Sequence, residues 1–528
     1  RLQDALAQAE EAVGLLESVR ATVADPGLRA SFLAFRRRIF DLAIRLHMDL
    51  GYVEAALALS ERARARSLLD LLQEARTDIR EGIPPELRDR ELSLAYQLAS
   101  KARLLRASAS EEKRVQLQRE LTGLLAEADR LKDQIRRSNP RYAVLDQPPL
   151  DAAGIRGLLD PDTVLLEYTL GEEVSFLWLV TPERVESFEL PGRAEIESAA
   201  RRSYEDLRSL EKDDAEAHRA LSRLLFGKVA DRLHCRRLVI VADGALQYVP
   251  FAVLPNPGDP SGNVPLIAGH EIVSLPSASV LGVQRRMLAS RPPAEKAVAI
   301  FADPVFHAAD LRLRKPGGGT APAPFSPPRA SEPSLPLQRL KATEREARAI
   351  AELLAPGQVS LALGVEASRA AALSGDLAKH RAVHFATHGM INSETPRLSF
   401  LALSMFDEKA QPQEGVLGLS DVYNLRLGAD LVVLSGCETA LGRDIQGEGL
   451  MGLTQGFFYA GARRVMASLW RVEDRATADL MTRFYRAMFQ EGLSPAAALR
   501  SAQLSILAEP RRQDPFYWAP FVLQGDWR

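Results

Sequence analysis

The strongest constraint on this chain comes from two short segments, one with a histidine and one with a cysteine. His388 lies three residues after the run Val-His-Phe at 383–385, and Cys437 lies three residues after Leu-Val-Val-Leu at 431–434. Largely apolar runs of this kind are typical of buried parallel strands. Because reactive groups collect beyond the carboxyl ends of strands in open parallel sheets, the sequence predicts that the two side chains lie side by side.

This pair supplies the parts for thiol catalysis. A free thiol has a pKa of about 8.5, and its thiolate is the attacking species. A neighbouring imidazole takes the thiol proton and later returns it to the leaving amine. Gly389 lets a substrate carbonyl approach the backbone, so we expect the N–H groups of Gly389 and Cys437 to form an oxyanion hole, each donor contributing roughly 3 kcal/mol. The sequence predicts Cys437 as nucleophile and His388 as base.

Metal binding is the alternative for the histidine segment. His384 and His388 have the spacing of a zinc motif, but that motif needs a helix and an intervening glutamate. The segment has the pattern of a strand, so we predict no metal site here and no cofactor for the chain.

Composition excludes several function classes. The 528 residues suggest three or four domains at about 150 residues each. The net charge of −2 gives no basic field for nucleic acid, and no apolar stretch reaches the ~20 residues of a membrane span. Only Cys235 and Cys437 occur, which fits a reducing cytoplasm. Cys235 precedes a strand and is interpreted as structural. Whether residues precede Arg1 stays open.

The front of the chain is expected to be all-helical. Residues 1–80 are rich in Ala, Leu, Arg and Glu, and 51–68 resemble one tetratricopeptide unit with small residues where helices cross. Ile83-Pro84-Pro85 breaks the helical pattern. Two amphipathic helices are predicted at 86–109 and 111–137. A hairpin packed on the rest of the protein is the simpler interpretation of them, and a regulatory lever is the alternative.

From Asp146 the pattern changes to alternating strands and helices, which predicts a mostly parallel sheet between helical layers. A first α/β half extends to about 295, and a second follows from 296. The expected elements are strands at 163–168, 174–180, 237–241, 271–275, 358–363 and 464–470, and helices at 341–355, 367–379 and 448–460, besides the His and Cys strands and a final strand.

Several motifs in order resemble the CHAT family, caspase-like cysteine proteases related to separase that are often joined to tetratricopeptide repeats. The sequence around Cys437 departs from the Gln-Ala-Cys context of caspases. The motifs that carry the resemblance are 298–304, 384–389, 430–439, 447–450, 459–462, 468–474 and 517–523.

The resemblance implies a fold and a domain plan. The fold is α/β, with a caspase-like three-layer α/β/α protease half and an inactive pseudo-protease α/β half, preceded by an all-α region. The expected domains are tetratricopeptide-like helices at 1–80, a helical hairpin at 81–145, the pseudo-protease half at 146–295 and the active half at 296–528.

The predicted function is a cysteine endopeptidase that cuts a specific protein substrate and is regulated by a protein partner on its N-terminal helices, in the cytoplasm and without binding nucleic acid or membrane. Trp470, Asp474 and Glu438 are the predicted substrate contacts, although a helix N-cap also explains Asp474. The resemblance further implies roles in bacterial defence or cell death. The alternative is a catalytically silent scaffold that binds other proteins.

Overall fold

The computed structural model describes residues 1–22, 26–64, 149–210, 214–259, 261–289, 291–313, 337–390, 399–438, 448–470 and 473–528, and scattered residues between 90 and 131. Within these ranges, the side chains of 15–37 and 437–452 lie outside the description. The helices predicted at 86–109 and 111–137 fall mostly outside the described residues.

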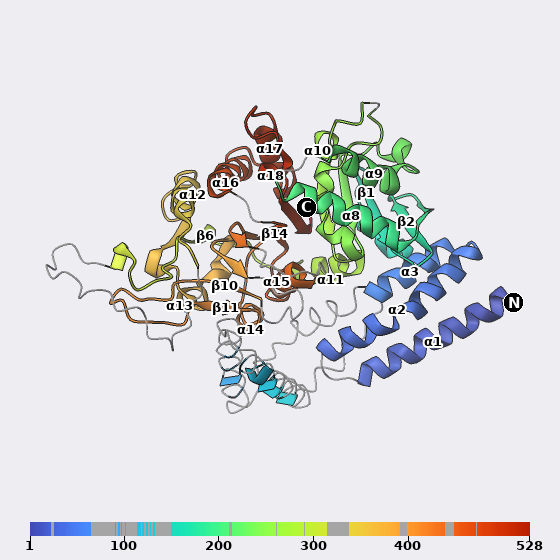
Figure 1. Ribbon diagram of the computed structural model, residues 1–528, viewed down its shortest axis with the longest axis horizontal. Helices are drawn as coiled ribbons and strands as arrows, with labels where there is room; N and C mark the ends of the chain where they lie inside the picture. Colours follow the sequence, from blue (N-terminus) through green and yellow to red (C-terminus); the bar gives the residue numbers. More distant parts are fainter. Residues whose placement is uncertain are drawn as a thin grey trace.

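Three helices open the chain and pack side by side in chain order: α1 (Leu2–Thr22), α2 (Pro26–Asp49) and α3 (Val53–Arg64). Figure 1 shows them at one end of the molecule, beside the part of the sheet that contains β2. Gly51 ends α2 with a φ of +77°, a left-handed conformation that glycine adopts without steric cost. Phe40, Ile44 and Leu57 are buried between the helices.

An 11-stranded sheet forms the centre of the described chain, in the order β3-β2-β1-β4-β5-β15-β14-β12-β8-β6-β7. Most neighbouring strands are parallel, as predicted. The strands are β1 (Thr163–Thr169), β2 (Val174–Val180), β3 (Val185–Pro191), β4 (Arg237–Val241), β5 (Glu271–Leu275), β6 (Lys296–Ala302), β7 (Val359–Leu363), β8 (His380–Ala386), β12 (Leu431–Leu434), β14 (Arg464–Ser468) and β15 (Phe521–Gly525).

The sheet has two parts with opposite strand directions. Strand β15 runs antiparallel to β14 and parallel to β5, where Gln524 pairs with Ser274. Strands β1, β4 and β5 therefore run opposite to β6, β8 and β12. As a consequence, the amino ends of β4 and β5 share a sheet edge with the carboxyl ends of β8 and β12.

Helices cover both faces of the sheet. Figure 1 shows α12, α16 and α17 on one side of the strands and α11, α14 and α15 on the other. The helices after α3 are α7 (Ala152–Arg156), α8 (Arg193–Leu207), α9 (Ala215–Phe226), α10 (Leu266–Gly269), α11 (Ala278–Leu288), α12 (Lys341–Glu352), α13 (Arg369–Ala372), α14 (Leu419–Tyr423), α15 (Glu448–Tyr459), α16 (Asp474–Phe489), α17 (Pro495–Leu507) and α18 (Pro515–Trp518). Short 3₁₀ turns are η2 (Ala230–Arg232), η3 (Gly244–Tyr248), η4 (Phe251–Val253), η5 (Leu311–Leu313), η6 (Gly364–Glu366) and η7 (Asp376–Lys379).

A second, four-stranded sheet lies beyond the carboxyl ends of β8 and β12, in the order β11-β10-β9-β13. Its strands are β9 (Gly389–Met390), β10 (Phe400–Ala402), β11 (Val416–Gly418) and β13 (Cys437–Glu438). This small sheet contains both segments that the sequence singled out.

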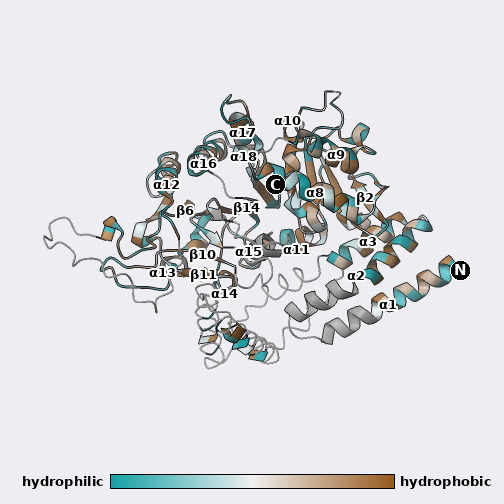
Figure 2. Cartoon of the chain, in the orientation of Figure 1, coloured by the Kyte–Doolittle hydropathy of each residue, from teal (hydrophilic) through white to brown (hydrophobic). Residues whose placement is uncertain are grey.

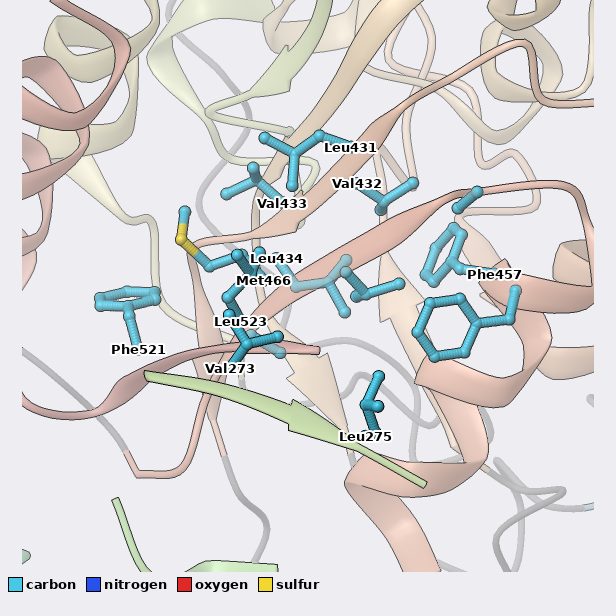
Figure 3. Close-up of a cluster of buried hydrophobic side chains, with 14 of the residues drawn as sticks. Val273, Leu275, Leu431, Val432, Val433, Leu434, Phe457, Met466, Phe521 and Leu523 are labelled. Atoms are coloured by element: carbon cyan, nitrogen blue, oxygen red, sulfur yellow. The ribbon is translucent and has the colours of Figure 1, made fainter. Parts of the chain in front are cut away.

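The hydrophobic core is continuous across the junction of the two parts of the main sheet. Figure 3 shows Val273 of β5 beside Leu523 of β15, close to Leu434 of β12. Along the chain, hydrophobic residues concentrate on the strands and polar residues on the outer sides of the helices (Figure 2). No helix among the described residues is long and apolar enough to span a bilayer.

The expected α/β class behind a helical front is confirmed, with three local corrections. The helix predicted at 367–379 is two short elements, α13 and η7, because Gly375 between them has a φ of +88°. The strand predicted at 464–470 ends at Ser468. Strand β3 and the four-stranded sheet were not predicted.

Candidate active site

The backbone brings the histidine and cysteine segments together. Strands β8 and β12 are parallel neighbours, with Phe385 opposite Leu434. Four residues after Phe385 and three after Leu434, β9 and β13 pair in parallel, with Gly389 opposite Cys437. The Cys437 backbone therefore lies one strand spacing from Gly389, and His388 precedes Gly389.

A glycine makes this approach possible. A Cβ atom on Gly436 would lie 2.4 Å from the Thr387 carbonyl oxygen and 2.8 Å from its amide nitrogen. Both are shorter than non-bonded contacts allow, so a side chain here would push the two segments apart. The Ser435 N–H donates to the Phe385 carbonyl at 3.0 Å and fixes the start of the turn. The sequence Ser435-Gly436-Cys437 thus places the cysteine directly beside the chain that carries His388.

The His388 ring is held by a backbone carbonyl. Its Nε2 lies 2.7 Å from the Gln338 carbonyl oxygen. Because a carbonyl only accepts, Nε2 carries the hydrogen, and in the neutral ring Nδ1 carries the lone pair. The Phe306 ring packs against the imidazole at a centroid distance of 5.4 Å. The residue is 1% exposed, so a peptide reaches it only if the surrounding chain moves.

Gln338 is fixed by an ion pair on its neighbour. Arg339 donates to both carboxylate oxygens of Asp303, at 2.8 and 2.6 Å. Asp303 also binds Arg312, and its N–H donates to the Thr343 hydroxyl at 3.1 Å. Asp303 is 2% exposed and has a φ of +50°, so it is a buried, constrained anchor at the end of β6. The segment that carries the Gln338 carbonyl is therefore tied to the main sheet.

The predicted oxyanion donors also take part in the small sheet. A parallel bridge uses both the N–H and the C=O of one of its two paired residues. Pairing of Cys437 with Gly389 therefore engages one of the two N–H groups proposed for the oxyanion hole. The Cys437 thiol and the Glu438 carboxylate lie outside the described side chains.

Two other predicted substrate contacts are described. Trp470 is 2% exposed, donates from Nε1 to the Phe516 carbonyl at 3.3 Å and packs edge-on against Tyr204 of α8. It therefore lies in the junction between the two parts of the sheet. Asp474 is half-buried at the first position of α16, and the N-cap is Glu473. The expectation that Asp474 caps the helix is therefore wrong by one residue, because the helix begins at Asp474.

Sequence reasoning missed the groups that hold His388. Gln338 acts through its backbone carbonyl, which any residue carries, so no sequence signal identifies it. Phe306 and Arg339 lie far from His388 along the chain. Asp303 belongs to a motif that resembles the CHAT family, and this was the one available signal.

A second cysteine–histidine contact occurs in the other part of the sheet. The Cys235 sulfur lies 3.9 Å from Nδ1 of His270, and the same Nδ1 lies 2.7 Å from the Cys235 carbonyl oxygen. Burial raises the pKa of the Cys235 thiol to about 11, and burial also lowers the pKa of His270. A thiol with this pKa is almost entirely protonated at neutral pH, which supports the structural interpretation of Cys235.

Comparison with curated proteins finds tetratricopeptide repeat protein 28 of Mus musculus, 26% identical over 319 residues, and of Homo sapiens, 26% identical over 326 residues. Each alignment covers 55% of this chain and 12% of the relative, so the chain corresponds to a small part of those proteins.

Solved structures with a similar course of the chain include the Saccharomyces cerevisiae separase–securin complex, with a TM-score of 0.49, 11% identity, and coverage of 99% of this chain and 37% of that chain. Another is the Arg-specific cysteine proteinase gingipain R, with a TM-score of 0.34, 9% identity, and coverage of 63% and 74%. Both scores lie under 0.5, so the fold described above rests on this chain's own strand order.

The family assignment rests on the sequence of the α/β region. Residues 215–526, more than half of the chain, match the CHAT domain. This range contains both the histidine and the cysteine segments and most of the main sheet. The chain belongs to the CHAT domain family.

Proposed function

We propose that the chain is a cysteine endopeptidase in which Cys437 is the nucleophile and His388 the base. The observation that carries the proposal is the pairing of Cys437 with Gly389 next to a histidine whose Nε2 is held by a carbonyl. That carbonyl leaves the basic nitrogen of the neutral ring at Nδ1. Because His388 is buried, the proposed enzyme acts only when its site opens, and on few substrates.

The proposed reaction has two steps. The Cys437 sulfur attacks the carbonyl carbon of the scissile peptide while His388 Nδ1 takes the thiol proton. The carbon–nitrogen bond then breaks, the same proton passes to the leaving amine, and a thioester remains on Cys437. Water hydrolyses the thioester with His388 again as base. Throughout, the Gln338 carbonyl accepts from Nε2–H and stabilises the imidazolium.

The oxyanion is proposed to bind the N–H groups of Gly389 and Cys437. Because the bridge between β9 and β13 engages one of them, we expect substrate to compete with this pairing. One free donor still supplies roughly 3 kcal/mol of transition-state stabilisation. Glu438 and Asp474 remain proposed substrate contacts. Trp470 is proposed to act only if the junction around Tyr204 rearranges.

The test is site-specific cutting of a candidate protein, first the one encoded next to this chain. We expect wild type to give two product masses that define one peptide bond, the Cys235→Ala variant to give the same products, and Cys437→Ala to give none. Cutting at the same bond by Cys437→Ala would refute the proposal.

A silent scaffold is the second candidate, and the burial of His388 favours it. The enzyme and the scaffold predict different rates of cysteine alkylation. In an enzyme, Cys437 reacts with iodoacetamide faster than Cys235, and His388→Ala removes the difference. In a scaffold, both cysteines react equally slowly.

We also propose that the N-terminal helices regulate the site. The supporting contacts come from α3, whose Glu61 is 0% exposed. The Glu61 carboxylate accepts from the N–H groups of Ala278 and Ser279, at 3.0 and 2.6 Å, at the N-terminus of α11. A carboxylate at this end of a helix is stabilised by the helix dipole.

Helix α11 continues this connection into the other part of the sheet. Gln284 donates to the Ala462 carbonyl at 2.7 Å, and Arg285 pairs with Asp526 at 2.7 Å. Just after the helix, Arg291 pairs with Asp430, the residue before β12. A displacement of α3 therefore has a route to the strand that leads to Cys437.

Glu61→Gln tests this route, because it keeps one acceptor but removes the charge, at a cost of about 1 kcal/mol. We expect faster hydrogen exchange at 278–291 and at 429–430, and altered cutting. Glu54→Gln, on the exposed face of the same helix, is the matched control and should change neither. Unchanged exchange in Glu61→Gln would contradict the route.

The remaining assignments are proposals of the same kind. We propose the domain division at residues 80, 145 and 295. The last boundary is supported by the strand order, because the strands before residue 295 all lie on one side of β15 and the other strands of the main sheet lie on its other side. A cytoplasmic location is proposed from the two cysteines, and roles in defence or cell death from the family resemblance alone.

A further inference from the structure

A completely buried polar network lies beneath the candidate dyad. His384, on β8, has Nε2 2.9 Å from the Glu346 carboxylate of α12 and 3.0 Å from the Ser435 hydroxyl. Its Nδ1 lies 3.1 Å from the Tyr485 hydroxyl of α16. The four residues are between 0 and 3% exposed. The proposed reaction uses none of them.

Burial raises the free-energy cost of leaving any polar group of this network without a partner. A carboxylate without water needs a paired charge or a shared proton, and His384 Nε2 offers this to Glu346 at 2.9 Å, although neither carboxylate oxygen makes a well-aligned hydrogen bond among the described residues. Burial, with the charge of Glu346 as a second cause, holds the pKa of Tyr485 well above its usual 10, so Tyr485 stays a neutral phenol. The imidazole is therefore fixed on both nitrogens, with its ring plane set by α12 and α16.

The network joins the two segments that carry the reacting residues. His384 lies on β8, which ends two residues before His388, and Ser435 is two residues before Cys437. The bond from His384 to Ser435 therefore links the strand ends, directly below the turn where Gly436 touches Thr387. We expect a change in this bond to shift the cysteine turn relative to His388.

We propose that Glu346 and His384 form a positioning unit that holds the Ser435–Cys437 turn in register with His388. The unit touches no reacting atom and acts through Ser435. This inference rests on the proposed function, because it concerns the alignment of the same thiol and imidazole.

The chain contains a matched control for this arrangement. At the opposite end of β8, His380 Nε2 lies 2.8 Å from the Ser360 hydroxyl, and its Nδ1 lies 2.9 Å from the Asp376 carbonyl oxygen. This is again a serine bonded to a histidine of the same strand, but it lies at the end far from Cys437. Loss of the Ser360 hydroxyl should affect stability without affecting the thiol.

The experiment measures the rate of Cys437 alkylation by iodoacetamide at neutral pH, with Cys235 as reference in the same sample and with the melting temperature of each variant. We expect Ser435→Ala to slow Cys437 alkylation about tenfold, since misplacement of a reacting group by a fraction of an ångström has effects of this size. Ser435→Thr, which keeps the hydroxyl, should restore the rate. Ser360→Ala should leave it unchanged.

Tyr485→Phe is the second variant and keeps the buried ring while it removes the hydroxyl on Nδ1. It should slow Cys437 in the same direction as Ser435→Ala. An unchanged rate in both variants would overturn the positioning role, and so would an equal loss in Ser360→Ala. The His388→Ala variant distinguishes a failure of the positioning role from a failure of the proposed function. If His388→Ala does not slow Cys437 alkylation, the proposed function fails and the positioning unit fails with it.

Discussion

The described residues bring a cysteine segment and a histidine segment together in two places: the side chains of Cys235 and His270 are in contact, and the backbone of Cys437 pairs with Gly389 next to His388. Cys235 and His270 precede β4 and β5, whereas His388 and Cys437 follow β8 and β12. Since the two parts of the sheet run in opposite directions, both pairs lie on the same edge. Five strand steps separate β4 from β8, which is roughly 24 Å at about 4.8 Å a step.

The two histidines carry their hydrogen on different ring nitrogens, and this difference decides which of them can accept a thiol proton. His270 uses Nδ1–H to bind the Cys235 carbonyl, and the same nitrogen faces the sulfur. A nitrogen that already carries a hydrogen cannot take the thiol proton. His388 instead uses Nε2–H to bind Gln338, which leaves the lone pair at Nδ1. A thiol near an imidazole is therefore not by itself a dyad, because the carbonyl bound to the ring decides which nitrogen is basic.

The largest expected effect comes from removing the base. With a pKa of about 11, Cys235 at pH 7 is thiolate to roughly one part in ten thousand. Its alkylation should rise about tenfold with each pH unit up to about pH 11. Cys437 should react at neutral pH, and His388→Ala should slow it on the order of a hundredfold or more. Mass spectrometry of both labelled peptides between pH 6 and 10 measures this. Parallel pH profiles for the two cysteines would contradict the prediction that Cys437 has a base and Cys235 does not.

A smaller effect is expected from the segment that carries the carbonyl. Arg339→Gln removes the bidentate pair with Asp303 but leaves Arg312 on that carboxylate. The Gln338 carbonyl should then orient His388 less well and lower Cys437 reactivity and cutting about tenfold, the worth of one charge-assisted hydrogen bond.

The control for Arg339→Gln is Arg345→Gln, because the exposed Arg345 of α12 pairs with Asp479 at 3.4 Å and shares no carboxylate with Arg339. It removes one Arg–carboxylate pair from the same region without touching Gln338. Equal losses in both variants would assign the effect to α12 rather than to the carbonyl.

The sequence predicted most of the helices and strands but not all of the contacts between them. The apolar runs before His388 and Cys437 predicted two parallel strands, because burial on both faces requires that pattern. The pairing of β9 with β13 depends on two residues in each strand, too few for any periodicity to reveal. The contact of Cys235 with His270 spans 35 residues, which is too far for a local pattern to indicate it.

The position of His384 shows why the roles of side chains were harder to predict than the helices and strands. In the sequence, the spacing of His384 from His388 resembled only a zinc motif, which the strand pattern argued against. The partners of His384 on α12 and α16 come from about 40 and 100 residues away. In the sequence, Glu346 looks like any other glutamate of a helix. Only the fold shows that its carboxylate is buried beside His384 of β8. Local patterns therefore predict strands and helices well, whereas polar networks are set by tertiary packing.

The smallest expected effect belongs to His270. Burial lowers its pKa in the folded chain, so the unfolded chain binds the proton first as the pH falls below about 6.5. Stability from this residue is thus complete above pH 6.5 and is lost as the pH falls through the lowered folded pKa. His270→Asn, which can still donate to the Cys235 carbonyl, should flatten the melting temperature between pH 7 and 5. It should change the labelling of either cysteine by less than about twofold, because His270 takes no proton from sulfur. A large drop in Cys235 labelling in this variant would instead make His270 a working base, and the distinction between the two pairs would no longer depend on the tautomer.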